Sequence, residues 1–465
     1  MVIRTGRADL AFDGIRTEFG LRSSFPAAVL AEAEAAVSRS AGDRPDLTSI
    51  PLVTIDPPGA KDLDQALCLE KTASGFVVHY AIADLGLFVT PGGALDLEVR
   101  QRGQTIYLPD GNVPLHPTVL SEGAASLLPG VVRPAVLWTF TCSAAGVPTA
   151  VEVRRALVRS QAQFDYAAVQ ESFDAGNPHP SVAALAEFGP LRRALARERG
   201  AIELQLPEQE IESNGSGWKL VMRPRADVDA WNAEISLMTG MAAASIMLEA
   251  RVGVLRTLPN PDAAAVSSLR KSAAALKVPW PADVSPGAFL AGLDASTPEA
   301  LALFTDATRL LRGAGYSAFN GSVPDVTTHA GVAAPYTHVT APLRRLVDRF
   351  ATEVCLAVSA GQELPVWLAE ALPQLPSLMG ASDSLASKVE RASLDLVEAW
   401  VLAGRVGQEF DAVVLRSGDH EAEIFIATPP ILAKCAGPRL PEAERIRVRL
   451  TEANPTTRQV RFTRS

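Results

Sequence analysis

"TIDPPGAKDLDQAL", residues 54–67, is the stretch on which the fold and the chemistry of this chain depend. Three carboxylates, those of Asp56, Asp62 and Asp64, fall within nine residues of it. Asp62 and Asp64 are two residues apart, so on an extended segment both side chains point to the same face. The prolines and glycine of residues 57–61 indicate a turn, which would bring Asp56 beside the other two. The stretch therefore predicts an acidic cluster on a loop between two strands.

An acidic cluster of this kind favours a bound cation. Like charges held close together have raised pKa values unless a cation lies among them. Mg²⁺ prefers carboxylate oxygens and water, and metal ions held in this way activate a water and stabilise the leaving oxygen of a phosphodiester. The sequence does not separate Mg²⁺ from Mn²⁺. The alternative is a solvated acidic loop without a metal, and the residues of the loop alone leave that alternative open.

The residues on either side of the loop predict β-structure. LVTID precedes it, and LDQALCLEK and GFVVHYAIADLGLFV follow it, so residues 52–160 are expected to be mostly sheet. Residues 161–310 are expected to be largely helical, with helices near 181–196, 230–253 and 263–276. Residues 341–360 and 381–406 are again helical in pattern. The last sixty residues or so return to short strands, which are typical of a small OB-type barrel.

The 465 residues are too many for one ordinary core. We expect an α+β protein with a helical N-terminal module at 1–50, a catalytic domain at 51–403 with a mixed sheet and surrounding helices, and a small β-barrel at 404–465. Within the first module, Ser24-Phe25-Pro26 predicts the start of one helix through a serine cap, and a shorter helix is expected near residues 8–19.

The composition restricts the compartment and the partners. No signal peptide and no membrane span are expected, and the four widely spaced cysteines suit a reducing compartment, so cytoplasm is the expectation. The net charge of -9 argues mildly against nucleic acid as a partner, although an acidic surface can surround a basic channel. No coiled-coil repeat is visible, so a monomer is expected.

Four separated blocks resemble the ribonuclease II/R (RNB) exoribonucleases. DPPGAKDLDQAL is similar to the family's acidic signature, and HYAIADLGLFVTPGGALDLEVRQRGQTIYLPDGNVPLHP follows the family order downstream. YTHVTAPLRR, residues 336–345, resembles a third block, and Val389-Glu390-Arg391 a fourth. The resemblance implies a metal-dependent 3′-to-5′ exoribonuclease with an RNB-type domain and a C-terminal S1-like OB-fold. It implies single-stranded RNA with a free 3′ end as the substrate, processive hydrolysis and 5′-mononucleotide products.

The resemblance also implies roles for single residues. Asp64, Asp62 and Arg344 match catalytic positions, with the guanidinium of Arg344 placed to contact the scissile phosphate. Tyr107 and Tyr166 match tyrosines that stack on or enclose the terminal nucleotide, and Glu390 matches a glutamate near its ribose. Alternatively, these side chains are core tyrosines and surface charges. The metal ligands implied by the resemblance are Asp56, Asp62, Asp64 and Gln65.

The chain also departs from the family pattern. Gln65 stands where the family has a fourth acid, and an amide oxygen carries no charge for a metal. About fifty N-terminal residues cannot hold the two cold-shock barrels of typical relatives, so a short form is expected. Within the last sixty residues only Phe410, Phe425 and Phe462 offer a base-stacking surface. Two other functions stay open: an RNA-binding protein on a weakly active nuclease fold, and a phosphoesterase acting on small nucleotides.

Overall fold

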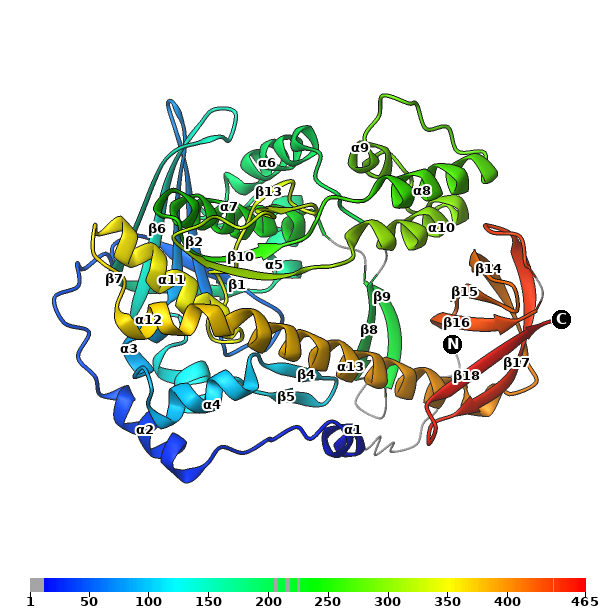
Figure 1. Cartoon of the computed structure of the whole chain (residues 1–465), viewed down its shortest axis with the longest axis horizontal. Coiled ribbons are helices and arrows are strands. Elements are labelled where there is room, and N and C mark those ends of the chain that lie inside the picture. The colour runs from blue at the N-terminus through cyan, green and yellow to red at the C-terminus, as the bar shows by residue number, and fades with distance from the viewer. Residues whose placement is uncertain (1–11, 205–207, 214–217, 224–225, 438) are drawn as a thin grey trace.

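A computed structural model describes residues 12–204, 208–213, 218–223, 226–437 and 439–465. The architecture is α+β, as predicted (Figure 1). A strand barrel surrounded by helices forms one end of the molecule, and a smaller barrel forms the other. A long helix, α13 (Leu375–Leu402), runs from the first part to the second.

The first barrel closes in the order β1-β2-β3-β6-β7. Its neighbouring strands are antiparallel except β1 and β7, which are parallel, so the sheet is mixed. Alternating apolar side chains fill its core, and Phe76, Trp138 and Phe140 are almost fully buried. The bounds are Leu52–Ile55 (β1), Gln65–Thr72 (β2), Gly75–Ala83 (β3), Val132–Ser143 (β6) and Pro148–Phe164 (β7).

The barrel decides where the acidic loop lies. Because β1 and β2 are antiparallel neighbours, with Val53 opposite Leu67, the loop that joins them begins and ends at one end of the barrel. Ile55 pairs with Phe164 at the end of β7, so the helix after β7, α5 (Tyr166–Asp174), starts at that same end. The topology therefore places the acidic loop and Tyr166 side by side.

Residues 84–124 are not mostly sheet, contrary to the prediction. Asp84 accepts a hydrogen bond from the backbone N–H of Gly86 and caps a short helix. Leu85 and Phe88 are three residues apart, so a helix places both side chains on its buried face. A second helix and a small hairpin follow, and a π-helical turn ends the segment. The bounds are Leu85–Phe88 (α3), Ala94–Arg102 (α4), Ile106–Leu108 (β4), Gly111–Val113 (β5) and Leu120–Ala124 (η1).

Helices predominate after β7, as predicted, but strands interrupt them. The helix expected at 230–253 is α7 (Asp227–Ala250), and it ends where Arg251 adopts a left-handed conformation before β10. By length and composition α7 could cross a membrane, but Ile235, Met238 and Met247 are buried within the protein. The other bounds are Leu185–Arg199 (α6), Glu208–Ser213 (β8), Trp218–Arg223 (β9), Val252–Thr257 (β10), Ala263–Ala275 (α8), Pro286–Ala291 (α9), Pro298–Ala307 (α10), Thr308–Leu311 (η2), Gly315–Asn320 (β11), Thr328–His329 (β12) and Ala334–Pro335 (β13).

The C-terminal strands form the predicted OB-type barrel, closed in the order β14-β15-β16-β18-β17. Phe462 is fully buried and packs edge-on against Phe410, so these two rings form the core of this barrel and offer no base-stacking surface. The bounds are Leu346–Ser359 (α11), Val366–Ala371 (α12), Leu372–Gln374 (η3), Ala403–Arg405 (η4), Glu409–Ser417 (β14), Glu421–Ala427 (β15), Pro430–Ala436 (β16), Arg445–Asn454 (β17) and Gln459–Arg464 (β18).

Two helices precede the first barrel. They are α1 (Asp13–Glu18), which falls within the range predicted from residue 8, and α2 (Ala27–Val37). Residues 8–11 of that prediction lie outside the described residues. The serine cap predicted for α2 is absent, because Pro26 occupies the cap position and has no side-chain oxygen to accept a hydrogen bond.

Candidate active site

One cavity of about 640 Å³ opens at the end of the first barrel where the acidic loop lies. Seven of the eight residues singled out from the sequence line it, although they come from four separate parts of the chain. They are Asp56, Asp62, Asp64, Gln65, Tyr107, Tyr166 and Arg344.

Local backbone contacts shape the acidic loop. Gly59 has a φ of 80°, which suits glycine, and the N–H of Ala60 donates to the carbonyl of Pro57 across the turn. Leu63 is fully buried and its N–H donates to Ser126. Because Leu63 points into the core, Asp62 and Asp64 on either side of it turn toward the cavity.

The three carboxylates are held where their charged forms are costly. Burial, with a smaller contribution from the neighbouring Asp62, raises the pKa of Asp56 to about 6. Burial likewise raises the pKa values of Asp62 and Asp64, while the guanidinium of Arg344 opposes each of these shifts. Oδ2 of Asp56 is buried without a hydrogen-bond partner. The four acidic side chains of the lining therefore outnumber its two cationic ones, Lys61 and Arg344.

Asp64 joins the barrel to the loop that carries Arg344. Its Oδ1 accepts a hydrogen bond of 2.7 Å from the N–H of Leu343, and its Oδ2 lies 3.6 Å from Nε of Arg344. The buried Asp348 shapes the same loop by accepting the N–H of Ala341 and pairing with Arg345. Arg345 is therefore engaged in structure, whereas the side chain of Arg344 is 47% exposed and faces the cavity.

Gln65 makes a contact that the sequence did not indicate. Its Nε2 donates to the backbone carbonyl of Thr340, and Oγ1 of Thr340 is bonded to Ser236 of α7 at 2.7 Å. An aspartate at position 65 has no N–H to donate to that carbonyl. Gln65 thus ties the start of β2 to the loop that leads to Arg344.

The two tyrosines come from different elements, and both follow the carboxylates in the chain. Tyr107 stands on β4 with 52% of its surface exposed, and its hydroxyl lies 3.5 Å from Oδ2 of Asp62. The hydroxyl of Tyr166 accepts a hydrogen bond from Nδ2 of Asn232 on α7. Both rings line the cavity.

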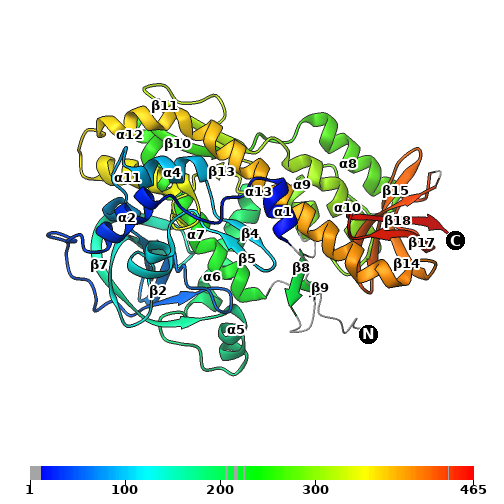
Figure 2. The ribbon, with the colours of Figure 1, turned by 90° about the horizontal axis from the view of Figure 1, so that it is seen from below.

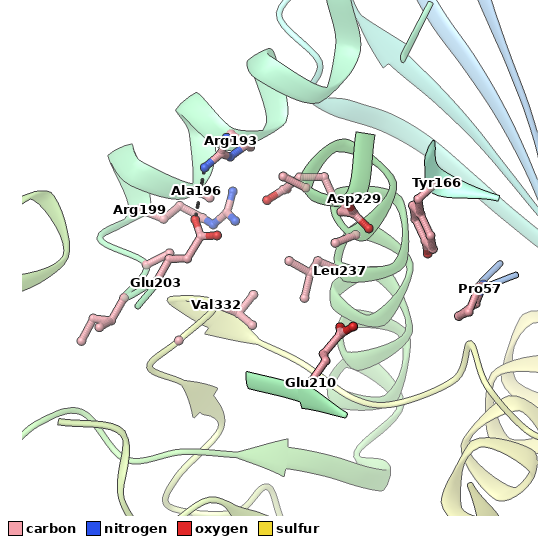
Figure 3. Close-up of a pocket in the computed structure, with 16 residues that line it drawn as sticks. Pro57, Tyr166, Arg193, Ala196, Arg199, Glu203, Glu210, Asp229, Leu237 and Val332 are labelled. Carbon is pink, nitrogen blue, oxygen red and sulfur yellow. Dashed lines mark hydrogen bonds and ion pairs between the residues drawn. The ribbon is translucent and has the colours of Figure 1, made fainter. Parts of the chain in front are cut away.

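A second cavity of about 460 Å³ adjoins the first, because Pro57 and Tyr166 line both (Figure 3). Arg193, Arg199 and Glu203 project into it from the side of α6, opposite Tyr166. Its lining includes Glu234, whose Oε2 is buried without a partner and whose pKa is raised by burial. Sequence reasoning missed Glu234, and the only signal was an acid within an apolar helix.

Glu390 is not brought to either cavity. It lies on an exposed face of α13 and is absent from the residues that line the two cavities. Its neighbour Arg391 pairs with Asp395, one turn further along the helix. Two histidines outside the proposed set, His79 and His338, bond Thr139 and Tyr316, as expected for packed or supporting side chains.

Within the described ranges, no three His, Cys, Asp or Glu side chains stand close enough together to hold one metal ion. The acidic loop therefore places carboxylate oxygens that can bind a metal ion on one wall of the cavity, but it does not surround an ion with a complete set of protein ligands. Mg²⁺ commonly binds through one or two carboxylates and completes its shell with waters and substrate phosphates, so such a wall is compatible with it.

The family model for the RNB domain matches residues 44–357, and that for the RNase II-type exonuclease C-terminal S1 domain matches residues 408–465. Ribonuclease R of Escherichia coli is 31% identical over 322 residues, which cover 66% of this chain and 39% of that protein. The chain thus spans well under half of the length of that relative.

Solved structures share the fold. Apo RNase R of Mycoplasma genitalium has a TM-score of 0.87 at 19% identity, covering 98% of this chain and 77% of that one. Yeast Ssd1, described as a pseudonuclease, has a TM-score of 0.71 at 17% identity, covering 90% of this chain and 52% of that one.

Proposed function

This chain belongs to the RNB-domain family of exoribonucleases, and on that premise we propose that it degrades single-stranded RNA from the 3′ end. The products are 5′-mononucleotides, released by hydrolysis in a processive manner. The observation that carries the proposal is one cavity in which three carboxylates, an exposed arginine and two tyrosines meet. This combination suits a phosphodiester whose terminal base is stacked on an aromatic ring.

The donor set fits a divalent cation, and nucleases of this family depend on a metal. We assign Mg²⁺, with Mn²⁺ as a substitute, to the wall formed by Asp56, Asp62, Asp64 and the oxygen of Gln65, where one or two carboxylates would bind the ion directly and the others would act through its waters. The unpartnered Oδ2 of Asp56 and the raised carboxylate pKa values support a cation here. When bound, such a metal supplies charge that lowers the pKa of a water.

The protein's own groups position and stabilise the substrate. The guanidinium of Arg344 is planar and exposed, so it can fork two oxygens of the scissile phosphate as negative charge builds on them. Asp64 holds that arginine's loop in place through the N–H of Leu343 and is assigned, with Asp62, to orient the attacking water. Tyr107 provides a sequence-independent stacking surface, which suits an enzyme that removes every base.

The adjoining cavity takes the terminal nucleotide in this proposal. Tyr166 separates it from the carboxylates, and Glu234 offers a buried carboxylate oxygen that can accept a hydrogen bond from a ribose 2′-hydroxyl. In this proposal Glu234 takes the RNA-selective role that the family resemblance implied for Glu390. A Glu234→Gln variant tests the assignment through the ratio of RNA to DNA cleavage.

The partner we propose is single-stranded RNA with a free 3′ end. RNase R of Mycoplasma genitalium has been solved in complex with ribose-methylated single-stranded RNA. A monomer and a cytoplasmic location stay our expectations, and the four cysteines are buried and free.

The test is digestion of a 5′-labelled single-stranded RNA of about thirty nucleotides with Mg²⁺. Wild type is compared with Asp64→Asn, and with Asp325→Asn as a control at an exposed carboxylate away from the cavity. Loss of at least about a hundredfold in rate is expected for Asp64→Asn only, as a residue used in the transition state implies. A 3′-labelled copy of the RNA must release mononucleotides first. Internal cleavage, or no cleavage by wild type, overturns the proposal.

A second function is favoured by one observation, the replacement of the fourth acid by Gln65. In that case the protein binds RNA and cleaves it poorly, and the fold it shares with the yeast pseudonuclease is compatible with this. The Gln65→Asp variant separates the two functions. A gain from near-zero activity supports the binding protein, whereas a loss of activity supports an enzyme in which the amide bond to Thr340 is needed.

A further inference from the structure

The N-terminal strap, which we define as residues 12–25, crosses beneath α13 and touches both ends of the molecule (Figure 2). Phe12 is fully buried and packs edge-on against Trp218 of β9 at 5.3 Å between ring centroids. Glu18 pairs with Arg458 of the C-terminal barrel at 2.5 Å. Near its end, the guanidinium of Arg102 lies 3.7 Å above the ring of Phe25. The strap is therefore anchored at several separate points.

One further anchor reaches the hairpin that carries Tyr107. The guanidinium of Arg16 makes two hydrogen bonds to the carboxylate of Asp110, of 2.7 and 2.8 Å, at the turn between β4 and β5. The two side chains are only 17% and 33% exposed. A bidentate arginine–carboxylate pair fixes orientation as well as distance, so the turn is held in one position relative to the strap.

The hairpin needs such an anchor. Each of its strands has three residues, and two-stranded hairpins are marginal on their own in water. Ile106 and Leu108 are buried on one face, while Tyr107 faces the cavity from the other. At its base, the N–H of Thr105 donates to the carbonyl of Arg344. The hairpin is thus held at its base by the Arg344 loop and along its buried face by α13, and its turn is held by Arg16.

We propose that Arg16 is a positioning residue for the 3′-terminal end of the RNA. By holding Asp110, it fixes the hairpin so that the ring of Tyr107 stands over the carboxylate cavity before RNA arrives. The inference rests on the proposed function. It gives the N-terminal strap a role in substrate placement, although the strap lies outside both family-model matches.

Without the Arg16–Asp110 pair, the ring of Tyr107 is no longer preorganised for binding. A mobile Tyr107 must be ordered by each incoming strand, which reduces the stacking contribution to binding. Arg16→Ala is expected to raise KM for single-stranded RNA roughly fivefold, a fraction of what base stacking on an aromatic contributes. The value of kcat and the Mg²⁺ concentration for half-maximal rate should change much less, since Arg16 touches neither the carboxylates nor Arg344.

The experiment is a double-mutant cycle on Arg16 and Asp110. Arg16→Ala, Asp110→Ala and the double variant should show the same rise in KM, because all three remove the Arg16–Asp110 pair. Arg16→Ala also removes the contact of Arg16 with Asp13, which lies within α1 and does not reach the hairpin. The swapped pair, Arg16→Asp with Asp110→Arg, should recover part of the loss. A 2-aminopurine at the nucleotide next to the 3′ end, whose base lies over the carboxylate cavity in the proposed placement, reports stacking on Tyr107, and its quenching should weaken in the single variants and in Tyr107→Leu. Glu18→Ala is the matched control, since it cuts another anchor of the same strap.

Two results overturn the inference. One is wild-type KM and quenching in Arg16→Ala, and the other is an equal loss in Glu18→Ala, which would show a general effect of the strap on stability. If wild type neither cleaves nor binds RNA, the proposed function itself fails. If wild type is active and Arg16→Ala matches it, only the positioning role fails.

Discussion

At the scale of single residues, the charged carboxylates of the site lower the stability of the folded protein. Asp56 is partly buried beside Asp62, its Oδ2 is buried without a hydrogen-bond partner, and its pKa is raised to about 6. The unfolded chain ionises this group near its ordinary pKa, whereas the folded protein without metal does so only near pH 6. Ionised Asp56 therefore lowers the free energy of unfolding, and the full loss is reached above pH 6. Residues arranged for catalysis often carry such a cost.

Asp56→Asn should therefore stabilise the metal-free protein. We expect the free energy of unfolding at pH 8 to rise by about 1–2 kcal/mol, part of the cost implied by the raised pKa. Urea unfolding in EDTA measures this. Added Mg²⁺ should stabilise wild type and have little effect on the variant. A variant less stable than wild type in EDTA would show that Asp56 is structurally satisfied without a metal.

His116 is a second residue whose burial predicts a measurable effect. Its Nδ1 donates to the carbonyl of Leu343, next to Arg344, and burial lowers its pKa to about 4. The folded state keeps His116 neutral between pH 6.5 and 4, while the unfolded chain takes up a proton there. Neutral His116 therefore contributes to the free energy of unfolding in full above pH 6.5, and this contribution is lost as the pH falls toward 4.

The prediction for His116 is a difference in slope. Between pH 7.5 and pH 5, wild type should lose about 2 kcal/mol more unfolding free energy than His116→Gln, because the variant has no imidazole to protonate. Urea unfolding at several pH values gives both slopes. Parallel slopes would mean that the histidine can be protonated without leaving its place.

At the scale of secondary-structure elements, close approach between α7 and the segment before Arg344 shapes the site. Gly240 lies in α7, and its carbonyl accepts the N–H of Thr337. A Cβ at this position would lie 2.2 Å from the ring of Tyr336 and 2.4 Å from the carbonyl of Thr337. The glycine therefore allows the helix to pack directly on that backbone.

Gly240→Ala should move the segment and lower both stability and activity. We expect about 2 kcal/mol of destabilisation and a drop in kcat, since the same segment continues through Thr340 to Arg344. Gly380→Ala is the control. Gly380 lies in α13 with open space where a Cβ would stand, so alanine should stabilise the protein by about 0.5–1 kcal/mol. Equal effects of the two substitutions would show that helix propensity outweighs packing at position 240.

At the scale of the whole molecule, the size of the site restricts the substrate. The two adjoining cavities have volumes of about 640 and 460 Å³, which suit a few nucleotides of one strand and no duplex. The net charge of -9 adds no general attraction for RNA. Binding therefore has to come from local contacts near the 3′ end.

The expected outcome is a strong preference for single strands. A duplex with a 3′ overhang of about twenty nucleotides should be shortened until the duplex reaches the entrance, and a blunt duplex should resist digestion. Gel analysis of 5′-labelled substrates measures both. Digestion of the blunt duplex at the single-strand rate would contradict this prediction and would require a strand-separating surface.

The sequence by itself determined the fold class, the C-terminal barrel and the acidic loop, because local spacing and residue chemistry carry that information. The resemblance to the RNB family added the other residues that meet in the same cavity. Tertiary structure decided the rest. Asp64 and Leu343 bond across 279 positions, and Gln65 reaches Thr340 across 275, so no local pattern could reveal either contact. The exposed place of Glu390, the buried place of Glu234 and the anchor between Arg16 and Asp110 likewise follow from how distant elements pack.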